Sequence, residues 1–279
     1  MSHINKSAQQ LLAPIISNKK VGQYQQIIIN VGDLAALCKP GNFVAISVGG
    51  SHSVLILRRA FAIYRAIDKG PMGGSIELVV APHGEGSKWL CARNVGDFVD
   101  LIGPLGTAFG IPTTNANTML IGGGYGSAPL FALAELLKNR GCRVDMVLGA
   151  STANKIYAPL EGKRSVSSLT LTTDDGTAGI HGQISEAIPR LIREFGTEVI
   201  YSCGPMGMLS AIAKIADEFD LAHQCAVEEA MACGIGVCMT CVVPIKHEDG
   251  IKMVRTCIDG PVMDGSEIIW DRKTVLDAL

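Results

Sequence analysis

The stretch MACGIGVCMTC, residues 231–241, places three cysteines and two glycines within nine residues. Its cysteines have the spacing Cys-x4-Cys-x2-Cys, and fifteen further residues separate Cys241 from Cys257. This is the plant-type spacing of the four thiolate ligands of a [2Fe–2S] cluster. The sequence therefore predicts Cys233, Cys238, Cys241 and Cys257 as cluster ligands.

The two glycines of this loop have a physical role in such a site. Three thiolates must surround one side of a small anionic cluster without bulky side chains in the way. Gly234 and Gly236 can adopt backbone conformations closed to other residues, so that amide N–H groups approach the sulfurs. Cys257 then closes the site from the separate segment RTCIDGP.

Three other interpretations of these cysteines compete with the cluster. A structural zinc site more usually pairs two CxxC knuckles, and the chain has one. A redox dithiol at Cys238 and Cys241 leaves Cys233 and Cys257 unexplained. Buried structural cysteines without a ligand fit poorly, because glycine-flanked loops bury little. The spacing favours the cluster, which moves single electrons, so another group in the chain should exchange electrons with it.

The composition is that of an ordinary globular protein. The chain has 279 residues, of which 48% are hydrophobic and 18% charged, and a formal net charge of -2. This length allows two domains, or two domains and a small module. Because there is no basic excess and no run of lysine or arginine, nothing indicates a nucleic-acid partner.

The sequence predicts neither a membrane span nor an export signal. The first ten residues are polar. The most apolar stretch, 119–137, is interrupted by four glycines and Pro129 and carries Glu135, which favours a strand, a turn and a helix. The cysteines number nine, an odd count, and five of them are scattered. We therefore expect a reducing cytoplasm and no disulfide framework.

Residues 1–112 are predicted to form an antiparallel β-barrel. Turn signals such as KPGN and RNVGD separate segments of strand character. These segments are 23–30, 42–49, 52–64, 75–82 and 97–104. Six or so short strands with few helices are typical of a small barrel.

Residues 113–221 are predicted to form an α/β domain, and residues 222–279 a small [2Fe–2S] module. The expected strands are 117–124, 143–150, 169–176 and 197–205, and the expected helices are 128–141 and 206–219. Strands that alternate with helices imply a parallel sheet covered on both faces. The last segment is short, turn-rich and contains the cysteine loop.

The turn IGGGYGSAP, residues 121–129, lies at a strand-to-helix junction, where backbone N–H groups and the helix dipole favour a phosphate. It departs from the dinucleotide fingerprint, because Ser127 replaces the third glycine and no acidic residue lies convincingly on the next strand end. By itself it is equally compatible with a tight turn. Cys203, Gly204 and Pro205 strengthen the nucleotide interpretation, because ligands of open α/β sheets bind at such strand ends.

Two arginines occur in the mainly apolar strand LRRAFAIY, residues 57–64. A half-buried arginine requires an anion, and a phosphate is a natural one. We expect Arg58 to point to solvent at an edge and Arg59 to meet the anion. The later segment HGEGS offers donors at Gly86 and Ser87 to a second phosphate, although a plain turn fits it nearly as well.

A barrel with an arginine strand, followed by an α/β domain with GGGxGxxP and CGP, is the order of the ferredoxin reductase-like flavoproteins. With the cysteine loop, the chain after about residue 12 resembles the electron-transfer subunits of type B, NAD-linked dihydroorotate dehydrogenases. The segments that carry the resemblance are LRRAFAI (57–63), GPLGTAF (103–109), GGGYGSAPL (122–130), TTDDGTAG (172–179), YSCGPMGML (201–209) and VEEAMACGIGVCMTC…RTCIDGPVMD (227–264). The last segment is the most specific.

The resemblance implies three cofactor sites. The four cysteines would hold the [2Fe–2S] cluster. FAD would contact Arg59, Ala60, Phe61, Ala62, Leu78, Val79, Val80, Gly86 and Ser87. NAD would lie between Gly122, Gly123, Gly124 and Gly126 and the segment Cys203, Gly204 and Pro205. No side chain is implied as a general acid or base.

The chain departs from the family pattern near the flavin and the nicotinamide. The family usually has Arg-Pro-x-Ser where this chain has Arg59-Ala60-Phe61-Ala62, so a hydroxyl group is missing. One hydrogen bond is worth about 0.5–1.5 kcal/mol, or roughly 10–30 mV for a two-electron couple, which tunes a flavin without abolishing it. Val80 replaces a common aromatic residue, and Tyr125 replaces a small aliphatic one.

The implied activity is electron transfer in pyrimidine biosynthesis. Dihydroorotate oxidation at an FMN on a catalytic partner subunit would supply two electrons, which would reach NAD+ through the cluster and FAD. The resemblance also implies a 2+2 heterotetramer. A ferredoxin–NAD(P) reductase, the small subunit of an electron-bifurcating enzyme, and a zinc-stabilised scaffold are the alternatives. NAD is favoured over NADP because GASTANK, 149–155, lacks an arginine for a 2′-phosphate, although Lys155 could serve.

Overall fold

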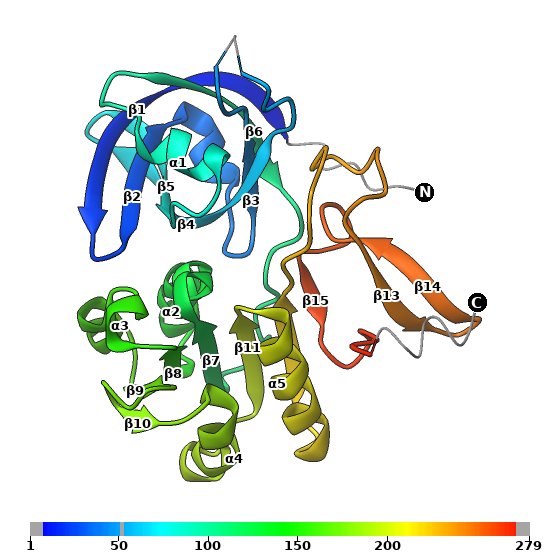
Figure 1. Cartoon of the computed structure of the whole chain (residues 1–279). Coiled ribbons are helices and arrows are strands. Elements are labelled where there is room, and N and C mark those ends of the chain that lie inside the picture. Colours follow the sequence, from blue (N-terminus) through cyan, green and yellow to red (C-terminus); the bar gives the residue numbers. More distant parts are fainter. Residues whose placement is uncertain (1–7, 51–52, 272–279) are drawn as a thin grey trace.

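The structure, a computed structural model, describes residues 8–50 and 53–271. It consists of a barrel, an α/β domain and a C-terminal segment beside both (Figure 1). The first residue of the strand expected at 52–64 lies outside the described residues, as do most of the first ten. Within the described part of the chain, no helix is long and apolar enough to cross a membrane.

Six strands, all paired antiparallel, close into a barrel in the order β1-β2-β5-β4-β3-β6. They are β1 (Gln9–Val21), β2 (Tyr24–Asn30), β3 (Phe43–Ile46), β4 (Arg59–Gly70), β5 (Gly73–Val80) and β6 (Phe98–Leu105). Alternate side chains such as Ile27, Ile29 and Leu101 fill its interior. The expected antiparallel barrel is thereby confirmed.

Strand β1 has no counterpart among the expected segments. It pairs with β6 over Gln9–Pro14 and with β2 from Ile15 onward. The pairing register shifts between Ile15 and Ser17. This irregularity breaks the alternation of apolar and polar residues on which the expectation of a strand depends.

Two short helical elements complete the barrel. The 3-10 helix η1 (Gly32–Leu37) follows β2, and α1 (Glu85–Cys91) follows β5. The expected turn at HGEGS therefore continues into a helix, which starts at Glu85. Gly84 occupies its N-cap position, and the Ser87 hydroxyl accepts hydrogen bonds from the backbone N–H groups of His83 and Gly84.

A seven-stranded sheet follows in the order β10-β9-β8-β7-β11-β12-β15, parallel except for the last pair. Its strands are β7 (Asn117–Gly123), β8 (Arg143–Ala150), β9 (Ser168–Thr173), β10 (Ile180–His181), β11 (Val199–Cys203), β12 (Ala222–Ala226) and β15 (Val262–Asp264). Its helices are η2 (Gly124–Ser127), α2 (Ala128–Asn139), η3 (Ala153–Lys155), α3 (Pro159–Ser165), α4 (Ile184–Phe195) and α5 (Met206–Glu218).

Helices cover both faces of this sheet, as expected for a parallel sheet. Leu120 of β7 packs in one cluster with residues of α2, whereas Met119 and Ile121 pack in another with residues of α4 and α5. The alternation follows from the period of two along a strand. The doubly covered sheet places its strand ends at one edge, facing the barrel.

The C-terminal part returns to this sheet on both sides of the cysteine loop. β12 pairs with β11, and β15 pairs with β12. The loop lies beside the barrel, whereas the hairpin of β13 (Val242–His247) and β14 (Gly250–Arg255) lies beside β15 (Figure 1). The expected boundary at residue 222 therefore falls between α5 and β12, within one continuous sheet.

Candidate functional site

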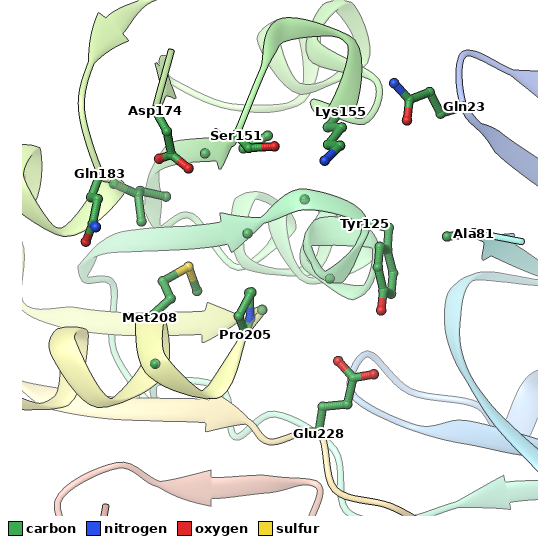
Figure 2. A pocket seen from close by; sticks show the side chains of 18 of the residues that line it. Gln23, Ala81, Tyr125, Ser151, Lys155, Asp174, Gln183, Pro205, Met208 and Glu228 are labelled. Carbon is green, nitrogen blue, oxygen red and sulfur yellow. The ribbon is translucent and has the colours of Figure 1, made fainter. Parts of the chain in front are cut away.

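A cleft of about 610 Å³ lies between the barrel and the carboxyl ends of the parallel strands (Figure 2). The barrel contributes Gln23, Tyr24, Ala81, Pro82 and His83 to its wall. The α/β domain contributes Gly123, Gly124, Gly126, Gly149, Ser151, Asp174, Gly204 and Pro205, among others. The expected glycine turn and the expected CGP segment thus share one cleft.

The two segments approach so closely that only glycine fits between them. A Cβ atom on Gly126 would lie 2.9 Å from the Cα of Gly204, and one on Gly123 would lie 2.8 Å from the Cδ of Pro205. Gly122 lies beneath, where a Cβ would meet the Cβ of Ser127 at 2.4 Å. The glycines therefore hold the strand-to-helix turn open to a ligand at the position where parallel sheets bind nucleotides.

Cys203 is the last residue of β11 and directly precedes Gly204 and Pro205 of the cleft wall. Burial and, to a lesser extent, the nearby Glu228 carboxylate raise the pKa of its thiol to about 12. Burial also raises the pKa of the Tyr125 hydroxyl, again with Glu228 as a contributor. Both groups therefore stay protonated at neutral pH.

Sequence reasoning missed several residues of the cleft. Asp174 follows β9 directly and lines the wall, although no acidic residue was expected to mark a strand end. The segment TTDDG contains two aspartates that could have indicated this residue. The fingerprint, however, expects an acidic residue at the end of the strand after the glycine turn, which is β8, and Asp174 follows β9. Tyr24, His83 and Gln183 could not be found, because only the packing of the barrel on the sheet brings them together.

The strand expected to bind the flavin presents an open face. Ala60 and Ala62 of β4 are exposed and Phe61 is half-buried. Arg59 donates to the backbone carbonyl of Leu57 and makes no ion pair with a carboxylate among the described residues. A Cβ on Gly86 would lie 3.0 Å from the Cγ of Arg59, so the two predicted segments meet. An uncompensated guanidinium beside an open apolar face fits a flavin with a pyrophosphate.

The expectation that Arg58 points to solvent is wrong. Its Nη2 lies 2.7 Å from the Asp100 carboxylate of β6, and its Nη1 donates to the Asp100 carbonyl at 2.9 Å. Its side chain is 20% exposed. Arg58, which directly precedes β4, thus reaches across β3 to β6, and Arg59 is the arginine left for an anion.

The remaining residues predicted to contact FAD divide by orientation. Leu78 and Val80 are buried in the barrel core, so only their backbone faces outward. Val79 is half-buried and packs on the side of the α/β domain. The Ser87 hydroxyl is engaged by the α1 cap, where it also donates to the carbonyl of Gly84.

The cysteine loop packs on the outer side of the barrel. Cys241 and Cys257 are buried in one cluster with Phe43 and Ala45 of β3 and Leu105 of β6. Gly234 lies over Ala45, with a Cβ position 3.5 Å from the alanine Cβ. Ala45 is the direct strand neighbour of Ala60 on β4. The loop is therefore one strand away from the predicted flavin face.

Two glycines shape the loop as the sequence predicts. Gly234 and Gly236 have positive φ angles of 70° and 81°. A Cβ on Gly236 would lie 2.3 Å from the Cδ1 of Ile258, and its carbonyl accepts a hydrogen bond of 2.8 Å from Nη1 of Arg255. The backbone N–H of Val237 donates to the Cys233 sulfur at 3.3 Å.

The four cysteines contact one another in two pairs. Cys238 hydrogen-bonds with Cys233, and Cys257 with Cys241. Hydrogen bonds from Thr240 lower the pKa of the Cys238 thiol to about 6, whereas burial raises that of Cys257 to about 12. In the described residues, no three His, Cys, Asp or Glu side chains are placed to hold one metal ion. A [2Fe–2S] cluster takes four thiolates, and the two contacting pairs fit it.

The segment GPLGTAF, which includes the end of β6, binds the chain that follows Cys257. The N–H of Thr107 donates to the Gly260 carbonyl at 2.6 Å, and its hydroxyl donates to the Val262 carbonyl at 3.0 Å. A Cβ on Gly106 would lie 2.4 Å from the Cδ of Pro261. The segment after Cys257 is thereby fixed to the barrel.

Comparison with known proteins finds relatives of the same architecture. Residues 228–269 match the family model for the iron-sulfur cluster binding domain of dihydroorotate dehydrogenase B. The chain is 32% identical over 239 residues to the protein of Desulforamulus reducens named dihydroorotate dehydrogenase B (NAD(+)), electron transfer subunit, covering 86% of this chain and 90% of that protein. The protein of the same name from Geobacillus kaustophilus is 34% identical over 233 residues, with 83% and 87% covered.

Solved structures share the fold. The structure of an NADH-dependent reduced ferredoxin-NADP oxidoreductase, studied for flavin-based electron bifurcation, matches with a TM-score of 0.80 and 29% identity, covering 94% of this chain and 91% of that chain. The cytochrome b5 reductase domain of Ulva prolifera nitrate reductase matches with a TM-score of 0.61 at 18% identity, covering 76% and 94%. The latter likeness concerns the barrel and sheet architecture alone.

Proposed function

Because the chain belongs to the family of the electron transfer subunits of NAD(+)-linked dihydroorotate dehydrogenase B, we propose that it carries electrons from dihydroorotate, by way of a [2Fe–2S] cluster and FAD, to NAD+. Oxidation of dihydroorotate releases two electrons and two protons, and NAD+ takes both electrons and one proton as a hydride. The chain is thus an oxidoreductase subunit of pyrimidine biosynthesis.

The observation that carries this proposal is the placement of the cysteine loop. The loop touches Ala45 on β3, and the neighbouring strand β4 offers the open face of Ala60 and Ala62. Adjacent strands lie about 4.8 Å apart, so a cluster and a flavin in these positions are close neighbours. The flavin is the group that joins a one-electron carrier to a two-electron acceptor.

The side chains of this chain place and insulate the cofactors. We propose that Cys233, Cys238, Cys241 and Cys257 ligate the cluster. Arg59 and Gly86 receive the FAD pyrophosphate beside Ala60–Ala62, and the backbone of Leu78–Val80 borders it. The glycine turn with Cys203–Pro205 receives NAD. The protonated Cys203 and Tyr125 keep additional negative charge away from the hydride path.

We propose a catalytic partner subunit that carries FMN, in a 2+2 heterotetramer. The names of the relatives as electron transfer subunits support the existence of a catalytic partner. The cluster loop exposes three apolar side chains, Ile235, Val237 and Met239. A one-electron relay must lie close to its donor, so this apolar loop is the expected contact with the partner.

We propose that the complex works in the cytoplasm. All nine cysteines are free thiols in the structure, including the five outside the cluster loop and RTCIDGP. Cytosolic conditions keep such thiols reduced, and the cluster requires thiolates as ligands.

The test is an anaerobic absorption spectrum of the purified chain, alone and co-expressed with an FMN-containing dihydroorotate dehydrogenase subunit, with iron and flavin assayed. We expect about two irons and one FAD per chain, and bleaching by dihydroorotate only in the complex. The variant Cys257→Ser should lose the iron while keeping FAD. Cys38→Ser is the matched control, because the Cys38 thiol donates to the Leu34 carbonyl far from the loop. A colourless protein, or FAD without iron in the unaltered chain, would overturn the proposal.

A second candidate function is favoured by one observation, the TM-score of 0.80 to the NADH-dependent reduced ferredoxin-NADP oxidoreductase. In that case the chain would be the small subunit of an electron-bifurcating enzyme. The same spectra separate the two functions. Cluster and flavin that are reduced by NADH yet remain oxidised with dihydroorotate and the partner subunit would support the second function.

A further inference from the structure

Thr256 carries a buried hydroxyl group for which the described part of the chain offers no partner. The residue is 0% exposed, and its Oγ1 is buried without a hydrogen bond among the described residues. Buried hydroxyl groups are nearly always hydrogen-bonded, because burying one without a partner costs free energy. The hydroxyl of Thr256 therefore indicates an acceptor that the polypeptide itself does not supply.

Thr256 lies directly opposite Cys241 at the open end of the hairpin of β13 and β14. Its N–H donates to the carbonyl of Cys241 at 2.8 Å, which extends the ladder of this hairpin by one pair. Directly opposed residues of an antiparallel pair project to the same face, with Cβ atoms about 4.5–5.5 Å apart. Val243 and Val254, the next pair on that face, are buried as well. The side chains of Thr256 and Cys241 are therefore neighbours on the buried face of the hairpin.

The other three proposed cluster ligands receive hydrogen bonds from the cysteine loop itself. The donors are the N–H of Val237 to Cys233, the hydroxyl and the N–H of Thr240 to Cys238, and the N–H of Gly236 to Cys257. Such donors orient thiolate ligands and stabilise their negative charge. Thr256 offers the corresponding donor beside the fourth ligand, Cys241.

We propose that the hydroxyl of Thr256 donates a hydrogen bond to the [2Fe–2S] cluster at the Cys241 thiolate and thereby raises the reduction potential of the cluster, a role that rests on the proposed ligands. Cluster sulfurs are negatively charged acceptors, which is the kind of partner that the Thr256 hydroxyl lacks. Reduction adds one negative charge to these acceptors. The hydrogen bond is therefore stronger in the reduced state than in the oxidised state, and it favours reduction.

Burial makes the Thr256 hydroxyl hard to replace. Thr240 is exposed, so a water molecule can take the place of its hydroxyl beside Cys238. Thr256 is closed to solvent, and a hydrogen bond in such an environment is electrostatically stronger than one in water. Removal of the Thr256 hydroxyl therefore leaves the neighbouring sulfur without a substitute donor.

The test is an anaerobic redox titration of the flavin-loaded chain, followed by the visible absorption and the electron paramagnetic resonance signal of the cluster. Thr256→Val keeps the shape of the side chain and removes the donor. At a given potential it should lower the ratio of reduced to oxidised cluster by about 10-fold, which is a midpoint lower by about 59 mV for one electron. Thr256→Ser should keep the midpoint of the unaltered chain, because it keeps the hydroxyl.

Thr172→Val is the matched control. The Thr172 hydroxyl is also buried without a partner among the described residues, but it lies on β9 of the α/β domain. This variant should leave the midpoint of the cluster unchanged. An unchanged midpoint in Thr256→Val with full iron, or an equal shift in Thr172→Val, would overturn the proposal.

A second pair of variants serves if Thr256→Val binds too little iron to be titrated. Thr256→Ala should then have a lower midpoint than Thr256→Ser, and equal midpoints in this pair would contradict the role of the hydroxyl. The proposed ligands fail separately, since an unaltered chain without iron would overturn them and this role together. Equal midpoints in iron-loaded proteins overturn only the role of Thr256.

Discussion

Gly236 is the glycine of the cluster loop at which a substitution is tolerated least. Its φ of 81° is reached at low cost only by glycine, and a Cβ there would lie 2.3 Å from the Cδ1 of Ile258. Gly234 has a similar φ of 70° but has room, with its nearest neighbour 3.5 Å from the Cβ position. Substitution of Gly234 would therefore cause backbone strain alone, whereas substitution of Gly236 would cause backbone strain and a steric clash.

We expect Gly236→Ala to lose most of its cluster and Gly234→Ala to retain more of it. The second substitution costs only the left-handed backbone conformation, about 1–2 kcal/mol, whereas the first also displaces the loop from Ile258. Iron per chain and the visible absorption of anaerobically purified protein measure the difference. Equal iron content in the two variants would contradict this account of the loop.

His223 predicts how stability depends on pH. It is buried on β12, its Nε2 lies 2.7 Å from the Ser202 hydroxyl, and its Nδ1 is buried without a partner among the described residues. Burial lowers the pKa of the imidazole to about 4, which the nearby Asp264 carboxylate only partly offsets. Below the ordinary histidine pKa of about 6.5, the unfolded chain therefore binds a proton at His223 that the folded protein does not bind.

The free energy of unfolding should consequently fall as the pH drops from about 6.5 to about 4, by roughly 3 kcal/mol, and this contribution should be fully present above that window. Urea unfolding followed by tryptophan fluorescence at several pH values measures it. His223→Gln should flatten the curve, and the exposed His181→Gln should not. A His223→Gln curve parallel to that of the unaltered chain would show that another group is responsible.

At the scale of elements, one polar network fastens the barrel to the α/β domain. Arg65 of β4 lies 2.8 Å from the Glu161 carboxylate of α3 and 2.7 Å from that of Glu135 on α2. The hydroxyl of the fully buried Tyr64 also donates to Glu161. Three elements from two domains, β4, α2 and α3, thus meet at Arg65.

Glu161→Gln should lower the free energy of unfolding by about 1–3 kcal/mol, since two hydrogen bonds lose their charge on a partly buried acceptor. Glu194→Gln is the control, because Glu194 pairs with Arg190 on the exposed surface of α4, where an ion pair is worth about 0.3–0.5 kcal/mol. Urea midpoints of the two variants measure the contrast. Similar losses in both would show that Glu161 does not join the domains.

Elements were predictable where their periodicity was regular. Strand β8 was expected at residues 143–150, the bounds it has. Helix α4 was not expected, because Pro189 interrupts its interior. Its buried residues nevertheless recur at helical spacing from Ile184 to Ile192, and packing against the sheet stabilises it. A regular hydrophobic pattern thus locates an element in the sequence. Where a local signal such as Pro189 conflicts with that pattern, tertiary packing determines whether the element forms.

At the scale of the molecule, the sequence suggests candidate cofactor ligands but not their relative positions. The four cysteines are candidates because of their spacing, and Arg59 is one because it is a charge in an apolar strand. That Gly234 lies over Ala45, which is distant in the sequence, follows only from the packing of the C-terminal cysteine loop on the barrel. Likewise Asp174 lines the cleft only because β9 ends beside β8. Long-range pairing brings these groups together, and one sequence holds no local signal for it.

The same arrangement supports the proposal that the exposed cluster loop is the face of the molecule through which electrons enter. Val237 is 76% exposed at the tip of this loop, next to Cys238. A charge there is harmless in water but is costly in an apolar interface. Leu160 on α3 is as exposed, at 74%, and belongs to the α/β domain away from the loop. The two positions therefore make a matched pair for locating the partner.

We expect Val237→Asp to weaken association with the FMN-containing subunit by at least about 10-fold, because an aspartate must be desolvated on binding. Leu160→Asp should bind as the unaltered chain does. Size-exclusion chromatography of the mixed subunits measures association, and iron per chain confirms that the cluster is intact in each variant. With full iron, a Val237→Asp chain that still forms the complex would place the docking face elsewhere on the barrel, and electrons would then have to enter away from the exposed loop.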